Sequence, residues 1–281
     1  MARALRLQFN NAVYHITSRG NARQKVFRTV QDREQFLDVL AQSLLRYSWL
    51  CHAYCLMDNH YHLLIETLEP NLSLGMRHVN GYYTQVFNKR HKNVGHLFQG
   101  RYKSILVEKG SHLLELIRYV VLNPVRAGMV ERPEQYEWSS YNGTVGYLRK
   151  LPWLSTDWVL GQFGDKRAEA VRRYETFVRE GIGKKEKPWE SLIGQIYYGS
   201  KEFVKGLKIK RREEELEEIP RRHKKPVRKV LGKIIKEGEG KEILEAIQEG
   251  YKQVEVARYL ELHYSVISRR LKSVEKTRNK T

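Results

Sequence analysis

The chain is poor in the residues and segments that mark secreted and membrane proteins. Among its 281 residues only two are cysteines, Cys51 and Cys55, so a disulfide framework is excluded and a reducing compartment is expected. No apolar run approaches the roughly 18 residues of a membrane-spanning helix, and no signal-peptide core is found. A phosphate loop of the GxxxxGKS kind is also missing, so no nucleotide cofactor is expected. These absences favour a cytoplasmic protein without a membrane partner.

Acidic residues are scarce relative to basic ones. The 51 Lys and Arg residues outnumber the 32 Asp and Glu residues, which gives a formal net charge of +19 and a pI near 9.8. Such an excess favours polyanionic partners, nucleic acid before membrane. The 17 tyrosines and five tryptophans also suit stacking on bases. On charge alone, a soluble basic enzyme with solvated Lys and Arg is an equally good interpretation.

Residues 1–130 alternate between strand and helix patterns. Strand alternation and helical spacing of apolar residues, interrupted by turn residues, define the elements. We predict strands at 12–18, 50–57, 60–67 and 97–108, and helices at 32–46, 73–90 (capped by Asn71 or Ser73) and from Ser111 to Asn123. The last helix should end there because a residue before proline avoids the helical region. This pattern predicts an α+β fold with helices packed on a mostly antiparallel sheet.

The remainder of the chain divides by composition. Residues 131–208 predict a helical extension of the first domain, and residues 209–229, "IKRREEELEEIPRRHKKPVRK", predict a charged linker. Residues 230–281 predict a separate helical domain with short helices at 241–249, 253–260 and 263–274.

The C-terminal segment resembles a helix-turn-helix, whose second helix enters the major groove. Ala257 is the small residue of the first helix, and Glu261 occupies the turn position where glycine is usual, at a cost of roughly 1 kcal/mol for a left-handed conformation. A helical bundle for protein contacts is the alternative. The residues expected to face DNA are His263, Tyr264, Ser265, Ser268 and Arg269.

Two histidines, His60 and His62, lie one residue apart in a predicted strand. Residues i and i+2 of a strand point the same way about 7 Å apart, so both imidazoles can approach one cation. Imidazole binds transition metals and, together with oxygen ligands, can hold Mn²⁺ or Mg²⁺. A polar strand face is the simpler interpretation of this pair alone. A two-residue turn at Asp58-Asn59 would pair Cys55 with His62, which also allows a zinc site, although cysteine is more often a buried small hydrophobe.

Tyr119 and Asn123 are four residues apart and share a helix face. A tyrosine hydroxyl can act as a nucleophile, and an amide oxygen can complete a metal site. An aromatic side chain in a helix–sheet interface is the alternative explanation for Tyr119.

Several segments resemble the signatures of the HUH-type tyrosine transposases, most of all the REP-associated subgroup. They are "LMDNHYHLLIE" (56–66), "HLFQGRYKS" (96–104), "RYVVLNPVRAGMV" (118–130), "VYHITSRGN" (13–21), "EWSSY" (137–141) and "PWESLIGQIYYGSKEFV" (188–204). The resemblance extends over residues 6–208. A C-terminal helix-turn-helix of the Trp repressor/DnaA-like type occurs in some members.

The resemblance implies a ferredoxin-like fold, Tyr119 as the nucleophile and His60 and His62 as ligands of Mg²⁺ or Mn²⁺. Asn123 matches the position at which some relatives have a polar third ligand. The implied reaction cleaves and rejoins single-stranded, hairpin-bearing DNA, such as repetitive palindromic elements, through a 5′-phosphotyrosine. Some relatives are homodimers that complete their active sites in trans.

Basic residues flank these motifs. Arg101, Lys103 and Arg118 are expected to hold backbone phosphates, unless they are solvated surface charges. A nucleoid-associated cytoplasmic location follows from these expectations. The competing hypothesis is a sequence-specific DNA-binding regulator whose transposase-like core is catalytically idle. The joint presence of Tyr119, His60 and His62 favours the enzyme.

Overall fold

The computed structural model describes most of the chain as two compact units, one within residues 4–211 and the other within residues 212–281. The described residues are 7–147, 151–184, 192–193, 196–210, 231–237, 239–248, 251, 253–262 and 264–278. The predicted linker therefore lies largely outside the described residues. Among the described helices, none is long and apolar enough to span a membrane.

The first unit begins with a β–α–β–β–α–β order. The elements are β1 (Ala12–Arg19), α1 (Val30–Arg46), β2 (Trp49–Met57), β3 (His60–Thr67), α2 (Leu72–His91) and β4 (Lys103–Val107). The strand order is β2-β3-β1-β4-β5, and the first four strands are antiparallel to their neighbours. This is the ferredoxin-like arrangement, and it confirms the predicted α+β class.

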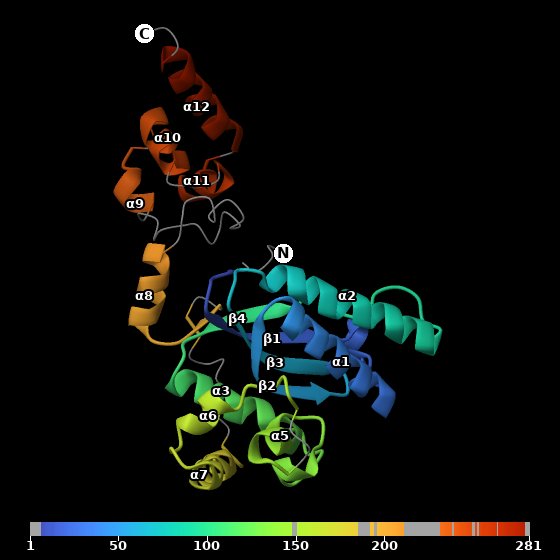
Figure 1. The fold of residues 1–281 in the computed structure, drawn as a ribbon. Helices are drawn as coiled ribbons and strands as arrows, with labels where there is room; N and C mark the ends of the chain where they lie inside the picture. The colour runs from blue at the N-terminus through green and yellow to red at the C-terminus, as the bar shows by residue number, and fades with distance from the viewer. Residues whose placement is uncertain are drawn as a thin grey trace. The chain divides into compact units, whose positions relative to one another are not determined.

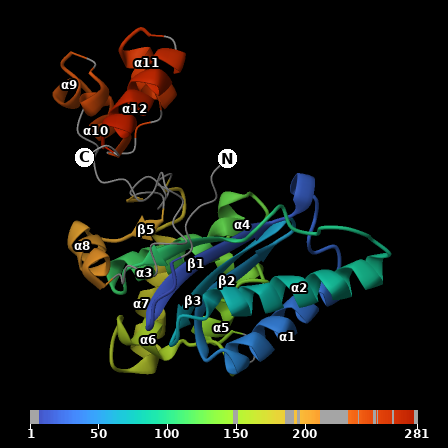
Figure 2. The same ribbon diagram turned by 90° about the horizontal axis from the view of Figure 1, so that it is seen from above.

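Helices cover both faces of the sheet (Figures 1 and 2). α1 and α2 cover the face that carries Tyr61, whose ring packs against Phe36 and Phe98. α3 (Ser111–Val121) covers the opposite face, where Leu64 joins its core with Leu116. The helices predicted at 32–46 and 73–90 thus lie on one face as expected, and the helix predicted from Ser111 covers the other face.

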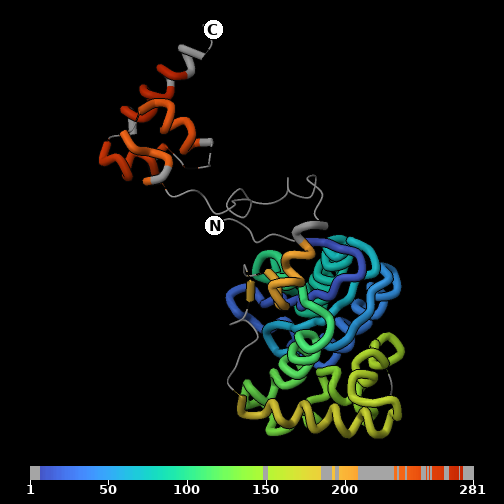
Figure 3. Tube along the Cα trace, turned by 90° about the vertical axis from the view of Figure 1, so that its left-hand side faces the viewer, coloured from blue at the N-terminus to red at the C-terminus, as the bar shows by residue number. Residues whose placement is uncertain are grey.

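The extension after α3 belongs to the same unit and shares the core beneath α3. It contains α4 (Asn123–Arg126), a 3₁₀ turn at Pro133–Gln135, α5 (Tyr141–Val145), α6 (Asp157–Gly161), α7 (Arg167–Arg179), β5 (Tyr197–Tyr198) and α8 (Lys201–Lys210). The other 3₁₀ turn, Asn21–Arg23, follows β1. α7 forms the outer layer on this side (Figure 3). The short strand β5, which pairs parallel with β4, was not predicted in this mainly helical region.

Two predicted boundaries in the first domain are wrong. The strand expected at 97–108 is confined to Lys103–Val107, because Gly100 has a positive φ of 67° and turns the chain before it. The helix from Ser111 does not stop at Asn123: after Leu122 it resumes as the single turn α4, with Pro124 in the first turn. Proline is tolerated there because the first-turn N–H groups lack helical partners.

The "EWSSY" segment covers the exposed edge of β2. Leu56 N donates to Trp138 O at 2.9 Å, and Ser140 N donates to Tyr54 O at 2.9 Å. The Ser140 hydroxyl also accepts from Tyr54 N at 3.1 Å. These bonds satisfy backbone groups that an open sheet edge would present to other chains.

The second unit contains four described helices around one core. They are α9 (Leu231–Ile234), α10 (Gly240–Gln248), α11 (Gln253–Tyr259) and α12 (Tyr264–Arg278). Val256, Ala257 and Ile267 are buried in this core, with Leu260 and Leu262 packed against it. Glu261, between α11 and α12, has the left-handed conformation expected at the turn, with a φ of 53°.

Asp32 is a buried carboxylate that joins the start of α1 to the end of α2. Its oxygens accept from the backbone N–H groups of Arg28 (2.9 Å) and Thr29 (3.0 Å), which completes a capping box. They also accept from Arg90 (2.7 Å) and His91 (2.9 Å). Burial raises the pKa of Asp32, but these four hydrogen bonds outweigh it and hold the pKa below its ordinary value.

We predict that Asp32→Asn lowers the free energy of unfolding of this unit by about 3 kcal/mol at pH 7, because it removes a buried carboxylate that pairs with Arg90 and accepts hydrogen bonds from two backbone N–H groups. A depressed pKa stabilises the folded state above the unfolded pKa, so the difference should shrink as the pH falls below about 4. Urea unfolding followed by tryptophan fluorescence measures this unit alone, since all five tryptophans precede residue 212. Asp38→Asn, an exposed change on the same helix, is the control and should stay within about 0.5 kcal/mol. An equal effect of both substitutions would contradict the assignment.

Candidate active site

His60 and His62 lie on the sheet face beneath α3. Their ring centroids are 5.0 Å apart, while Tyr61 between them points to the α1/α2 face. In the register of the sheet, Thr17 of β1 and Cys55 of β2 lie directly opposite His62. The strand alternation in the sequence thus predicted the face that the two histidines share.

The Asp58-Asn59 turn before the histidines is anchored to the segment that follows β1. Asp58 O accepts from Val26 N at 2.8 Å, and Asn59 O accepts from Gly20 N at 2.9 Å. The Asn59 side-chain oxygen lies 2.7 Å from His60 Nδ1, so this nitrogen donates to it. A neutral imidazole that donates from Nδ1 keeps the lone pair on Nε2, the form that a metal ligand needs.

His62 is buried at 6% exposure and contacts a third histidine, His15 of β1. His62 Nδ1 lies 2.9 Å from His15 Nε2. The other ring nitrogen, His62 Nε2, is buried and has no hydrogen-bond partner among the described residues. An orphaned buried nitrogen is costly unless something fills its position, so the donor set fits a cation.

The electrostatics of this cluster keep the imidazoles neutral at pH 7. Burial lowers the pKa of His15 to about 3. Burial, followed by the charge of Arg19, lowers the pKa of His60 to about 4. The pKa of His62 is lowered well below its ordinary value by burial and then by His15 and His60. Neutral imidazoles are the form that binds metal ions.

Tyr119 lies in the last full turn of α3 and faces this cluster. Its ring centroid is 6.2 Å from that of His62, in an edge-on arrangement. The guanidinium of Arg126, on α4, lies 5.0 Å from the centre of the Tyr119 ring. The structure therefore brings together the tyrosine and the two histidines that the sequence analysis selected, from a helix and a strand more than 50 residues apart.

Asn123 stabilises the junction between α3 and α4. Its Nδ2 donates to Tyr119 O at 3.0 Å and to Val120 O at 3.3 Å. The second bond replaces the one that Pro124 cannot donate to Val120 O, because proline lacks an N–H group. Only the Oδ1 atom of Asn123 is then left to serve as the predicted third ligand.

The three predicted phosphate-binding residues have different surroundings. Lys103 is exposed and lies opposite Thr17, on the histidine face of the sheet. Arg101 is exposed in the segment before β4. Arg118 instead pairs with Glu115 and lies with its guanidinium 4.4 Å from the centre of the Phe177 ring. With a side-chain exposure of 12%, Arg118 has a structural role in packing α7 against α3.

The alternative zinc site at Cys55 has little support. Cys55 does pair with His62 in the sheet, as the two-residue turn predicted. However, it is fully buried, its Sγ lies 3.6 Å from Met57 Sδ, and burial raises the pKa of its thiol. No group of three His, Cys, Asp or Glu side chains suitable for a metal occurs among the described residues.

The predicted DNA-facing residues of the second unit lie at α12. His263 falls outside the described residues, as do the side chains of Tyr264 and Ser265. Ser268 is half-buried and Arg269 is exposed.

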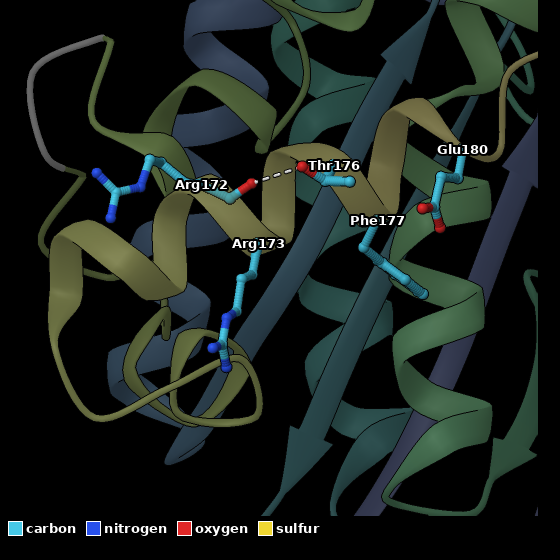
Figure 4. A pocket seen from close by; sticks show the side chains of 5 residues that line it. All are labelled: Arg172, Arg173, Thr176, Phe177 and Glu180. Atoms are coloured by element: carbon cyan, nitrogen blue, oxygen red, sulfur yellow. Dashed lines mark hydrogen bonds between the residues drawn. The ribbon is translucent and has the colours of Figure 1, made fainter.

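A shallow surface pocket lies on α7 (Figure 4). Its lining residues are Arg172, Arg173, Thr176, Phe177 and Glu180. It includes none of the histidines or Tyr119, so it is separate from the candidate active site.

Three residues beside the site were missed in the sequence: His15, Arg19 and Arg126. Strand alternation places His15 and Arg19 on one face of β1, but it does not show that this strand pairs with β3. Arg19 lies directly opposite His60. Arg126 ends the unexpected helical turn α4, so its position over Tyr119 could not be predicted from spacing.

Comparison with known proteins supports the sequence motifs. Residues 8–123 match the model of a family described as "Transposase IS200 like". No curated protein matches the chain significantly.

Among solved structures, a REP-associated tyrosine transposase bound to a REP hairpin is similar over 56% of this chain and 91% of its own, with 15% identity and a TM-score of 0.46. A candidate transposase from Deinococcus radiodurans R1 is similar over 44% of this chain and 95% of its own, with 15% identity and a TM-score of 0.30. The tRNA(His) guanylyltransferase of Saccharomyces cerevisiae is similar over 70% of this chain and 88% of its own, with 10% identity and a TM-score of 0.34.

These structural similarities are too low to establish a relationship. The family match does not depend on them, and it includes β1 to β4, both histidines, Tyr119 and Asn123. Residues 8–123 of the chain are therefore similar to the IS200-like transposase family.

Proposed function

We propose that this chain cleaves and rejoins single-stranded, hairpin-bearing DNA, with Tyr119 as the nucleophile and a 5′-phosphotyrosine as the intermediate. The observation that carries the proposal is the 6.2 Å separation between the rings of Tyr119 and His62. A nucleophile beside neutral imidazoles suits phosphoryl transfer better than binding alone, because an idle core needs no such arrangement. Repetitive palindromic elements are the proposed substrates.

In the proposed cleavage step, the Tyr119 oxygen attacks a backbone phosphorus. The bond from phosphorus to the 3′ oxygen breaks, the proton of the tyrosine hydroxyl ends on that oxygen, and the 5′ phosphate stays on Tyr119. Attack by a 3′-OH reverses the step and joins strands, so bond energy is retained without a nucleotide cofactor.

His60, His62 and the Oδ1 atom of Asn123 would hold a divalent cation, Mg²⁺ or Mn²⁺. When bound, such an ion polarises the scissile phosphate and stabilises the charge that develops on its oxygens. Asn59 supports this use of His60, because its hydrogen bond leaves the His60 Nε2 lone pair available.

Cationic side chains surround the histidines at the accessible end of the site. Arg19 lies opposite His60, Lys103 lies on the same sheet face, and Arg126 lies over Tyr119. Together they suit the backbone phosphates of a strand that passes Tyr119, and they would position it without reading its sequence. Arg101 would extend this contact along the segment before β4.

We predict that Tyr119→Phe lowers the rate of covalent adduct formation by at least about a thousandfold, because it removes the attacking oxygen. Binding of the same DNA strand should be nearly unchanged. Tyr102→Phe is the matched control, since the Tyr102 hydroxyl contacts Ser73 at 3.2 Å. Denaturing electrophoresis of a labelled hairpin strand detects the adduct. Cleavage at the original rate by the Tyr119 variant would remove this residue as nucleophile.

A second prediction concerns the cation. His60→Ala and His62→Ala should each abolish Mn²⁺-dependent cleavage, and a chelator should have the same effect on the unaltered chain. His78→Ala is the control, since His78 contacts Ser43 of α1, on the other face of the sheet. The assay is strand cleavage over a series of Mn²⁺ concentrations. Undiminished cleavage in excess chelator would rule out the role of the cation.

The C-terminal unit is proposed to add affinity for duplex DNA through α12. We predict that Arg269→Ala reduces the discrimination between matched and altered duplex sequences by roughly 1–3 kcal/mol, as expected for a side chain that contacts a base edge. Lys241→Ala, an exposed basic change on α10, is the control. Fluorescence anisotropy of the full chain at several salt concentrations measures both. A salt-sensitive loss of affinity that is equal for all duplex sequences would mean that Arg269 contacts phosphate. Unchanged duplex binding would contradict the recognition role.

A further inference from the structure

His15 is the buried histidine that the proposed chemistry does not yet use. It is 1% exposed and lies on β1, on the same face as His62. In the register of the sheet His15 lies opposite Leu64, while His62 lies opposite Thr17. The two histidines are therefore diagonal neighbours, close enough for their side chains to meet.

The two imidazole rings meet edge to edge. The planes differ by only 10°, and the ring centroids are 5.2 Å apart. His15 Nε2 and His62 Nδ1 are 2.9 Å apart. Adding to this the distance from each nitrogen to the centre of its own ring gives about the observed separation of the ring centroids. The two nitrogens thus lie on the line that joins the ring centres, within both ring planes. That is the direction of a ring N–H bond and of a ring lone pair, so the hydrogen bond is well aligned.

This hydrogen bond admits two proton arrangements. If His15 Nε2 donates, the proton of neutral His62 lies on Nε2, and a buried N–H group has no acceptor among the described residues. If His62 Nδ1 donates, the proton of neutral His15 lies on its Nδ1 atom, which is also buried, and the His62 Nε2 atom carries a lone pair instead. Burial of an N–H group is thus common to both arrangements. Only the second arrangement allows His62 to bind a cation, because a protonated ring nitrogen cannot act as a ligand.

We infer that His15 is a positioning residue, which accepts the hydrogen bond from His62 Nδ1 and so holds the His62 Nε2 lone pair toward the cation. The inference rests on the proposed function and deepens it, since it assigns one supporting partner to each metal-binding histidine. Asn59 accepts from His60 Nδ1 at 2.7 Å, and His15 accepts from His62 Nδ1 at 2.9 Å. Such partners set the tautomer and the orientation of a ligand.

The contact with His62 also means that His15 is not itself a ligand of the cation. Its Nε2 atom is engaged by His62, and no set of three metal-binding His, Cys, Asp or Glu residues exists in the described part of the chain. His15 therefore acts through His62 and does not contact the cation or the DNA.

Three substitutions of the full chain test this role. His15→Leu removes the acceptor, and His15→Asn keeps an amide that is too short to reach His62. His15→Gln places an oxygen as many bonds from Cβ as Nε2 of histidine. We expect the Leu and Asn variants to bind Mn²⁺ 10–100-fold more weakly, as for the loss of other supporting partners, and the Gln variant to recover most of the affinity. Mn²⁺ titration followed by electron paramagnetic resonance measures binding without any DNA.

A second readout uses the metal-free, unaltered chain, so it does not depend on how the variants fold. Long-range ¹H–¹⁵N correlation spectra distinguish a protonated ring nitrogen from an unprotonated one, and the loss of signals in His62→Ala assigns His62. We expect His62 to carry its proton on Nδ1. A proton on Nε2, or Mn²⁺ affinity unchanged in the folded Leu and Asn variants, would overturn the inference. Mn²⁺ binding with these properties but no covalent adduct on any strand would instead refute the proposed function alone.

Discussion

The register of β3 between β1 and β2 determines the chemistry of this molecule. Because side chains alternate along a strand, a slip of one residue would bury both histidines under α1 and α2 and turn Tyr61 toward α3. The Asp58-Asn59 turn opposes such a slip, since its backbone carbonyl groups bind the segment after β1. The same turn supplies the hydrogen bond to His60. The register is thus coupled to the orientation of a proposed ligand.

Burial and charge are divided across the site in a way that suits a polyanionic substrate. The interior holds neutral imidazoles, because burial lowers the pKa of each histidine there. The cations Arg19, Lys103 and Arg126 lie around it, where a phosphate backbone can meet them. A cation held by these imidazoles, as proposed, would interact more strongly with a phosphate oxygen than it would in water. Folding keeps Tyr119, the proposed nucleophile, close to the histidines through α3, which packs on the same face of the sheet.

Local patterns predicted the elements and the face of the sheet that carries His60 and His62, because strand and helix periods are properties of short segments. They did not predict His15, since its contact with His62 spans 47 residues and depends on which strands pair. Arg118 was expected to face DNA, but its partner Phe177 lies on α7, far along the chain. The turn at Asn123 was misjudged for a different reason. A side-chain amide donates where proline cannot, and so the chain stays helical.

The most direct test of the central claim is to locate a covalent bond between DNA and the protein. A hairpin-bearing single strand is incubated with the full chain and Mn²⁺, and the denatured product is digested with protease and nuclease and analysed by mass spectrometry. The account predicts one modified peptide, with a nucleotide phosphate on the Tyr119 oxygen. A modification on another residue, or duplex binding without any adduct across a panel of hairpin strands, would contradict it and favour a regulator with an idle core.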